Sequence, residues 1–246
     1  QEGSDPVSGW TVLRPHTLVV GLYSFDGDGA LVRTHRLPVV LEAASLDVVE
    51  AVGLPAPDLV IVNDEDLTYA VVRPDETSLS CLTASLGSLH DPMARSLAWS
   101  MLHNLVRDAV IDAALFVQAV LVHADDDTEP STLTVLLNQA LRVACRYADP
   151  HTRSVLLERL VADDSTGPST EGEPATVSGG WGRLRAAAPG SDAQIVRARA
   201  WLEAAGQARL LGEAGSAQVA ARAREILDGA LPGLELDADI RWRALT

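Results

Sequence analysis

The sequence predicts an α+β protein in two parts: a small antiparallel β-sandwich over residues 1–73, then an irregular α-helical solenoid or bundle of antiparallel helix pairs over residues 74–246. Apolar side chains follow the period of strands up to about Arg73 and that of helices from Asp75 onward. The length of 246 residues, with 47% apolar side chains, is sufficient to bury a core.

The first part contains short apolar runs that are separated by turn residues. Residues 11–23 and 31–37 are apolar with partial or full alternation, and Asp26-Gly27-Asp28-Gly29 between them indicates a hairpin turn. The run of residues 59–62 is entirely apolar and predicts a central strand. Residues 63–66 then predict a polar turn and residues 67–72 a last strand. Several short strands at this spacing are typical of a sandwich.

The second part shows apolar stripes and caps that predict a series of short helices. Asp91 and Asp149 are each followed by a proline, which is the pattern of an N-cap before the first helical position, and Ser191 caps a further helix. Helices of this length cannot bury their apolar faces alone, so we expect them to stack on one another. Residues 163–180 are rich in Ser, Thr, Gly, Pro and Glu and predict a flexible loop between helices.

The charge of the chain excludes several classes of function. The formal net charge is −15, and all 19 basic residues are arginines. A nucleic-acid-binding protein needs a basic face, so we expect no nucleic-acid partner. The absence of lysine excludes a Walker phosphate loop, a Schiff-base lysine and a Ser–Lys dyad. No apolar run approaches the roughly 20 residues that cross a bilayer, and the acidic N-terminus is no signal peptide, so we expect no membrane partner and a cytoplasmic location.

The residues that most often carry chemistry follow no catalytic pattern. Cys81 and Cys145 lie in apolar helical patterns, which favours free buried thiols in a reducing cytoplasm and leaves a disulfide as the alternative. A zinc-peptidase helix needs His-Glu-x-x-His, and no two histidines have that spacing. We expect surface or capping positions for all six, which are His16, His35, His90, His103, His123 and His151.

Other short patterns have simple structural interpretations. The calcium-loop pattern at residues 26–29 fails because Leu31 and Leu37 occupy the positions that need Gly and Glu. The acidic runs at residues 63–66 and 125–127 favour solvated loops over cation sites. We therefore expect no catalytic, cofactor-binding or metal-binding residue in this chain. The remaining interpretations are a loose loop at residues 179–182 that leads into a helix, and core positions for Trp99 and Trp201.

Several strings, in order along almost the whole chain, resemble actinobacterial aminopeptidase N, a zinc metalloaminopeptidase of the gluzincin family. The most specific string is Pro57-Asp-Leu-Val-Ile-Val-Asn-Asp-Glu-Asp-Leu-Thr-Tyr-Ala-Val-Val-Arg. It resembles part of the β-sandwich that follows the catalytic domain in this family. The other strings run over residues 13–23, 31–36, 89–99, 106–108, 147–150, 189–192 and 239–242.

The resemblance implies that the chain is the non-catalytic C-terminal portion of an enzyme that removes N-terminal residues from peptides. Zinc, the His-Glu-x-x-His motif and the Gly-x-Met-Glu-Asn motif then belong to a catalytic domain outside this sequence, and this chain alone is expected to be inactive. The expected partners are that catalytic domain of the same polypeptide and the parent's peptide substrates. The family's helical domain closes over the catalytic cleft and limits substrate access.

Two further expectations complete the interpretation. The family's helical domain continues beyond the position of Thr246, so this chain is interpreted as a fragment whose last helix exposes apolar surface. The alternative function is a stand-alone helical-repeat module that binds a peptide or protein partner in its groove. Sequence reasoning leaves open the peptide specificity, the residues that line the substrate chamber and the oligomeric state.

Overall fold

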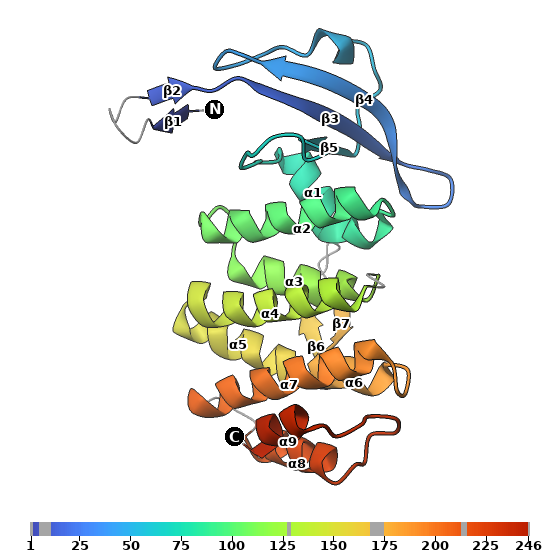
Figure 1. The fold of residues 1–246 in the computed structure, drawn as a ribbon, viewed down its shortest axis with the longest axis vertical. Helices are drawn as coiled ribbons and strands as arrows, with labels where there is room; N and C mark the ends of the chain where they lie inside the picture. Colours follow the sequence, from blue (N-terminus) through green and yellow to red (C-terminus); the bar gives the residue numbers. More distant parts are fainter. Residues whose placement is uncertain (1, 5–10, 127–128, 168–174, 213–215, 246) are drawn as a thin grey trace. The chain divides into compact units, whose positions relative to one another are not determined.

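The chain folds into two compact units, residues 1–105 and 106–246. The computed structural model describes residues 2–4, 11–126, 129–167, 175–212 and 216–245. The predicted two-part α+β class is confirmed, because a small antiparallel sheet precedes a series of helices (Figure 1). The predicted boundary at residues 73 and 74 marks the change from strands to helices, whereas contacts group the first helices with the sheet.

The first unit is built on a three-stranded antiparallel sheet in the order β4-β3-β5 (Figure 1). The central strand β3 supplies buried residues such as Leu18, Leu22 and Tyr23. The second sheet expected of a sandwich is represented in the described residues only by the pair β1 and β2. The strands are β1 (Glu2–Ser4), β2 (Thr11–Leu13), β3 (His16–Phe25), β4 (Leu31–Leu41) and β5 (Leu59–Val62).

The predicted hairpin turn between β3 and β4 is confirmed. The Asp26 carboxylate accepts hydrogen bonds from the backbone N–H groups of Asp28 and Ala30, both at 2.9 Å. Gly29 adopts a positive φ of 81°, a conformation that L side chains rarely reach. The side chain of Asp26 thus replaces backbone partners that the turn lacks.

A buried serine joins the edge strand β5 to the first helix, α1 (Glu76–Ser85). The Ser78 hydroxyl accepts a hydrogen bond from the backbone N–H of Val60 at 2.9 Å and donates one to the Asp75 carboxylate at 2.7 Å. The same carboxylate caps α1 by accepting from the backbone N–H of Ser78 at 3.0 Å. This arrangement satisfies a donor on an edge strand that would otherwise be open to pairing.

The first unit continues with η2 (Leu86–Ser88) and α2 (Pro92–Arg107), which begins at the predicted cap. The Asp91 carboxylate accepts from the backbone N–H of Ala94 at 2.9 Å. The buried face of α2 includes Ala98, Leu102 and the predicted core residue Trp99. A short 3-10 turn, η1 (Val49–Ala51), lies between β4 and β5.

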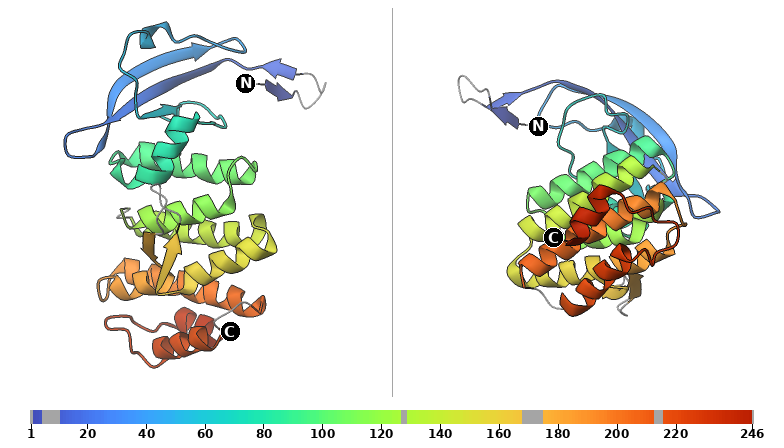
Figure 2. Two further views of the ribbon diagram at one scale, coloured as in Figure 1. Left: turned by 180° about the vertical axis from the view of Figure 1, so that it is seen from behind. Right: turned by 60° about the horizontal axis from the view of Figure 1, so that its bottom comes forward.

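The second unit is a stack of helices around α7, which packs on α4, α5, α6, α8 and α9 (Figure 2). The predicted caps at Asp149 and Ser191 are confirmed, because both side chains accept hydrogen bonds from backbone N–H groups. Trp242 and Leu245 of the last helix are 70% and 67% exposed. The helices are α3 (Ala113–His123), η3 (Ala124–Asp126), α4 (Pro130–Tyr147), α5 (Pro150–Val161), α6 (Gly180–Ala186), α7 (Asp192–Leu210), α8 (Ser216–Leu227) and α9 (Ala238–Leu245).

Two tryptophans form the center of the contact between α5, α6 and α7. The ring centroids of Trp181 and Trp201 lie 4.8 Å apart, and the Trp201 indole donates to the carbonyl of Val161 at 3.1 Å. The Arg222 guanidinium lies 5.5 Å from the Trp181 ring centroid and donates to the same carbonyl at 2.8 Å. The predicted core position of Trp201 is confirmed, whereas the expected loose loop at residues 179–182 begins helix α6.

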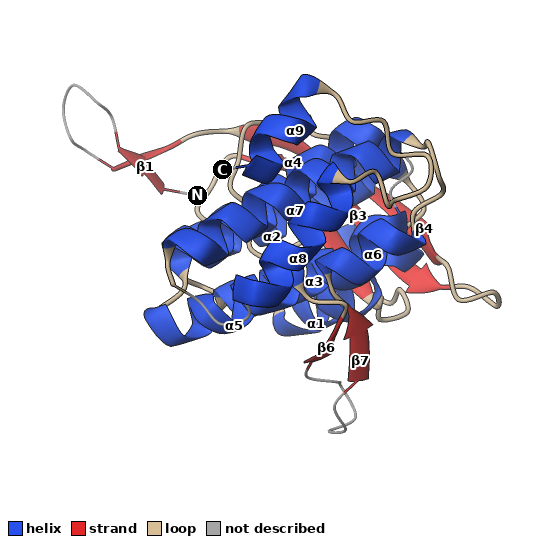
Figure 3. Ribbon diagram, turned by 90° about the horizontal axis from the view of Figure 1, so that it is seen from below, coloured by secondary structure: helices blue, strands red, loops and turns tan. Residues whose placement is uncertain are grey.

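Residues 163–180 differ from the predicted flexible loop. The described parts form an antiparallel pair, β6 (Asp164–Gly167) and β7 (Ala175–Ser178), at the periphery of the helices (Figure 3). A hydrogen bond from the backbone N–H of Gly179 to the carbonyl of Asp163, at 2.7 Å, closes the base of the pair. Residues 168–174 lie outside the described residues. The segment has no apolar alternation, so its composition indicated a loop. The closure between Gly179 and Asp163 is not visible in that composition.

No helix in the described parts of the chain is both long enough and apolar enough to cross a membrane.

The link between β5 and α1 generates a stability prediction. Replacement of Ser78 by Ala leaves the Val60 N–H without its acceptor and removes a donor to Asp75, so we expect a loss of about 1–3 kcal/mol in the free energy of unfolding. The matched control is Ser80→Ala, at an exposed position of the same helix. Urea unfolding followed by circular dichroism measures both, and equal losses would refute the role of the Ser78 hydroxyl.

The cap of α1 generates a pH dependence. Hydrogen bonds from the hydroxyl and backbone N–H of Ser78 hold the pKa of Asp75 below its usual range. Because the folded pKa lies below the unfolded value of about 3.9, the cap stabilises at higher pH and its contribution disappears as pH falls through the folded pKa. We expect Asp75→Asn to be less stable than the natural chain at pH 6 and to approach it near pH 3. A difference that stays constant with pH would contradict this.

Candidate functional site

The cysteines and histidines are spread over both units of the structure. Nowhere in the described ranges do three or more His, Cys, Asp or Glu side chains lie where they could jointly hold a metal ion. Cys81 and Cys145 are free and partly buried, and burial raises the pKa of the Cys81 thiol to about 11. The histidines are dispersed: His16 in β3, His35 in β4, His90 before α2, His103 in α2, His123 in α3 and His151 in α5.

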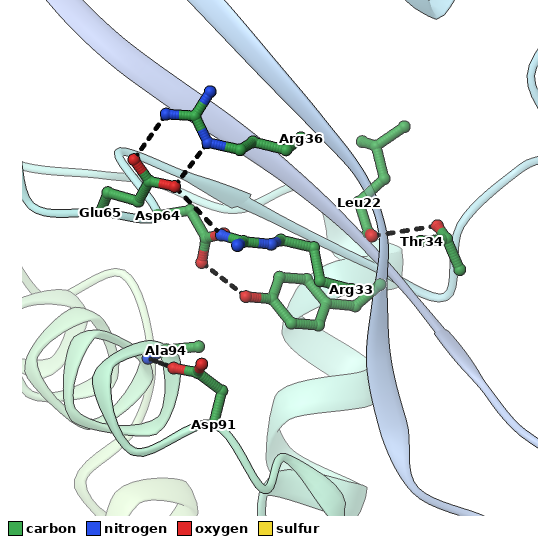
Figure 4. A network of polar contacts seen from close by, with 9 residues as sticks. Leu22, Arg33, Thr34, Arg36, Asp64, Glu65, Asp91 and Ala94 are labelled. Atoms are coloured by element: carbon green, nitrogen blue, oxygen red, sulfur yellow. Dashed lines mark hydrogen bonds and ion pairs between the residues drawn. The ribbon is translucent and has the colours of Figure 1, made fainter.

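An extensive polar network of the first unit lies where β5 ends, in the loop of residues 63–68 (Figure 4). Asn63 and Asp66 both have positive φ values, 63° and 51°, which Asn and Asp tolerate better than most residues. The Asn63 side-chain amide donates to the carbonyl of Thr68 at 2.7 Å and accepts from its N–H at 3.1 Å. The loop is therefore closed by one side chain.

The prediction of a strand over residues 67–72 is wrong, and this closure explains why. The segment has no strand pairing in the structure. Asn63 occupies both backbone groups of Thr68, and the Thr68 hydroxyl lies 2.6 Å from a ring nitrogen of His16. Backbone groups engaged by side chains are not available to a strand ladder, although the residue types favour one.

A fully buried carboxylate, that of Asp64, ties the loop to the sheet. It accepts a hydrogen bond from the Tyr23 hydroxyl at 2.7 Å and forms an ion pair with Arg33 at 2.9 Å. Gly21 of β3 allows this approach, since a Cβ atom there would collide with the Asp64 carboxylate and the Tyr23 ring. Both oxygens of a buried charge thus have partners, as burial of a carboxylate requires.

A second carboxylate extends the network at the surface. Glu65 accepts two hydrogen bonds from Arg36, at 2.6 and 2.7 Å, and lies 3.4 Å from Arg33 (Figure 4). The pKa of Glu65 is lowered, mainly by the hydrogen bond from Arg36. Burial, and then the bond to Asp64, raise the pKa of Tyr23. A phenol with a raised pKa and a carboxylate with a lowered one are unsuited to proton transfer near neutral pH.

The network therefore anchors the loop of residues 63–68 to the sheet. The side chains that are exposed next to this anchor are apolar. Leu67 at the end of the anchored loop, with Tyr69 and Val71 just after it, forms what we call the apolar segment. Tyr69 is fully exposed, and Leu67 and Val71 are each 56% exposed. Apolar side chains held out by a rigid anchor are a feature of contact surfaces. The apolar segment is thus a candidate binding surface.

Sequence reasoning identified the acidic turn at residues 63–66 but missed the anchor. The local sequence pattern predicts that Asp64 and Glu65 are solvated carboxylates in a loop. Nothing in that pattern shows that Tyr23, Arg33 and Arg36 lie close to them in the fold. Arg33 and Arg36 are three positions apart, so strict alternation would place them on opposite faces of β4. The register shift opposite Leu22 and Tyr23 lets both reach Glu65, and the local sequence gives no signal of it.

Comparison with known proteins relates the chain to peptidases. A family model described as "ERAP1-like C-terminal domain" matches residues 59–246. The chain is also 32% identical over 236 residues to a Streptomyces lividans protein named "Aminopeptidase N". This alignment covers 95% of the chain and 25% of the relative, so the chain spans about a quarter of that protein's length.

The close approach at Gly21 generates a prediction with a matched control. We expect Gly21→Ala to lower the free energy of unfolding by about 1–3 kcal/mol, because the added methyl group displaces Asp64 from its partners. At Gly27 a Cβ atom would meet nothing within 4 Å. Gly27→Ala should therefore change stability by less than about 0.5 kcal/mol. Chemical unfolding at neutral pH measures both, and an unaffected Gly21→Ala protein would exclude the buried anchor.

Proposed function

Because the chain belongs to the family of ERAP1-like C-terminal domains, we propose that it is the non-catalytic C-terminal portion of an aminopeptidase N, an enzyme that hydrolyses N-terminal residues from peptides. The family match, which covers three quarters of the chain and its whole helical part, carries this proposal. The relative in Streptomyces lividans supports the type of enzyme.

Zinc, in this proposal, is bound by a catalytic domain of the same polypeptide that lies outside this sequence. The residues present here do not fit a zinc site, since three suitable ligands come together nowhere in the part of the chain that the structure describes. No step of the hydrolysis is therefore assigned to a side chain of this sequence. The proposed location of the whole enzyme is the cytoplasm.

The helical unit has the proposed role of covering the catalytic cleft and limiting access of peptides. The apolar segment of Leu67, Tyr69 and Val71 has the proposed role of contacting the rest of the polypeptide. Two observations support the second role: the relative is about four times as long as the aligned region, and the three side chains are exposed on an anchored loop.

A direct assay tests the division of roles. We expect the isolated chain to release no fluorophore from an aminoacyl-coumarin substrate in the presence of zinc, whereas the full polypeptide does so. Turnover by the pure chain would overturn the non-catalytic assignment. A reading frame that begins at this chain, with no upstream His-Glu-x-x-His, would favour the alternative of a stand-alone module that binds a peptide or protein.

The apolar segment generates a second test. We expect Tyr69→Ser to weaken binding of this chain to the separately produced upstream portion by roughly tenfold, or about 1.4 kcal/mol, since a fully exposed aromatic ring finds its burial only in the complex. Val52→Ser is the matched control at another highly exposed position. Calorimetry measures both, with circular dichroism to verify folding. Equal affinities for the two variants would place the contact elsewhere.

A further inference from the structure

Two buried guanidinium groups of the second unit share one carboxylate. Arg197 of α7 and Arg183 of α6 form ion pairs with different oxygens of Asp125 in η3. The side chains of Arg197 and Arg183 are 8% and 13% exposed, whereas that of Asp125 is 46% exposed. The cluster is therefore most open at its anionic member.

Among the described residues, the charges of this cluster do not balance. Within the described ranges, Asp125 is the only carboxylate bonded to either guanidinium, so two positive charges meet one negative charge. Arg183 also donates from Nε to the carbonyl of Ser178 at 2.9 Å. A guanidinium carries five N–H donors, so both groups retain donors beyond these bonds. A buried cation without full compensation is costly, and a bound anion would remove the cost.

The pKa values of the two arginines reflect the same imbalance. Burial, with a further contribution from neighbouring Arg197, lowers the pKa of Arg183 to about 10. Burial also lowers the pKa of Arg197. Both groups still carry their charge at neutral pH, so the excess of one positive charge persists there.

A cavity adjoins the cluster on one side. It has a volume of about 360 Å³, and Arg183, Arg197 and Asp125 line it together with Leu133, Ser178 and three alanines, Ala186, Ala187 and Ala193. A second cavity lined by the same two arginines is mostly apolar and has a volume of about 30 Å³. The smaller space has room for little more than a water molecule, so the larger one is the candidate for a ligand.

We propose that this cavity is a binding site for a small aliphatic monocarboxylate, whose carboxylate group meets Arg183 and Arg197 and whose short chain lies against Leu133 and the alanines. A planar carboxylate matches the fork of N–H groups on a guanidinium and brings the single negative charge that the cluster lacks. The site goes beyond the proposed function and does not depend on it.

Calorimetric titration of the full chain with sodium butyrate, in a buffer free of chloride, tests the site. We expect butyrate to bind, butyramide to show no binding, and sulfate to bind more weakly because a dianion exceeds the excess charge. Since the chain carries a net charge of −15, weak general attraction for anions is disfavoured, and uptake of butyrate would indicate a specific site.

Three variants locate the binding. Arg197→Gln removes the excess positive charge and should lower the affinity for butyrate at least tenfold. Asp125→Asn increases the excess positive charge and should raise that affinity several-fold. Arg185→Gln, at an exposed position of the same helix as Arg183, should leave affinity unchanged. Tryptophan fluorescence and circular dichroism verify folding. If Arg197→Gln fails to fold, the Asp125→Asn variant and the comparison with butyramide still test whether the site exists.

Equal signals from butyrate and butyramide, or an Asp125→Asn protein that binds butyrate less tightly, would overturn the site. Sulfate binding as tight as that of butyrate would overturn the assignment to a carboxylate ligand.

Discussion

The pairing of guanidinium groups with a single carboxylate at one junction in each unit is the constraint on which both units depend. Every basic residue is an arginine, so the chain has no compact ammonium group with which to balance a buried carboxylate. A guanidinium is planar, holds its charge and distributes several donors over two or more acceptors. Asp64 in the first unit and Asp125 in the second each sit at such a junction, but with different charge balances.

The first junction is closed. Asp64 has Tyr23 and Arg33 as partners, Glu65 adds a partner for Arg36, and the result is a rigid anchor that positions exposed apolar side chains. The second junction is open, because one half-exposed carboxylate serves two buried cations beside a cavity. The first arrangement suits a contact surface within a longer polypeptide, and the second suits an anionic ligand.

Much of the fold followed from local signals. The caps at Asp91, Asp149 and Ser191, and the turn at residues 26–29, were recognisable because each satisfies backbone groups only a few residues away. The predictions of secondary structure failed where a hydrogen-bond partner outside the local pattern engages the backbone. Asn63 occupies the backbone of Thr68 and prevents a strand, and the bond between Gly179 and Asp163 closes a hairpin in a segment with the composition of a loop.

The sequence by itself determined the class of fold, the positions of most helices and the family resemblance, because periodicity, caps and ordered strings are properties of neighbouring residues. Only the tertiary structure decided which charges meet. Tyr23 and Asp64 lie 41 positions apart, and Asp125 lies 58 and 72 positions from its two arginines. Spacing along the chain carries no information about such pairs, since their energy exists only after the strands and helices have packed.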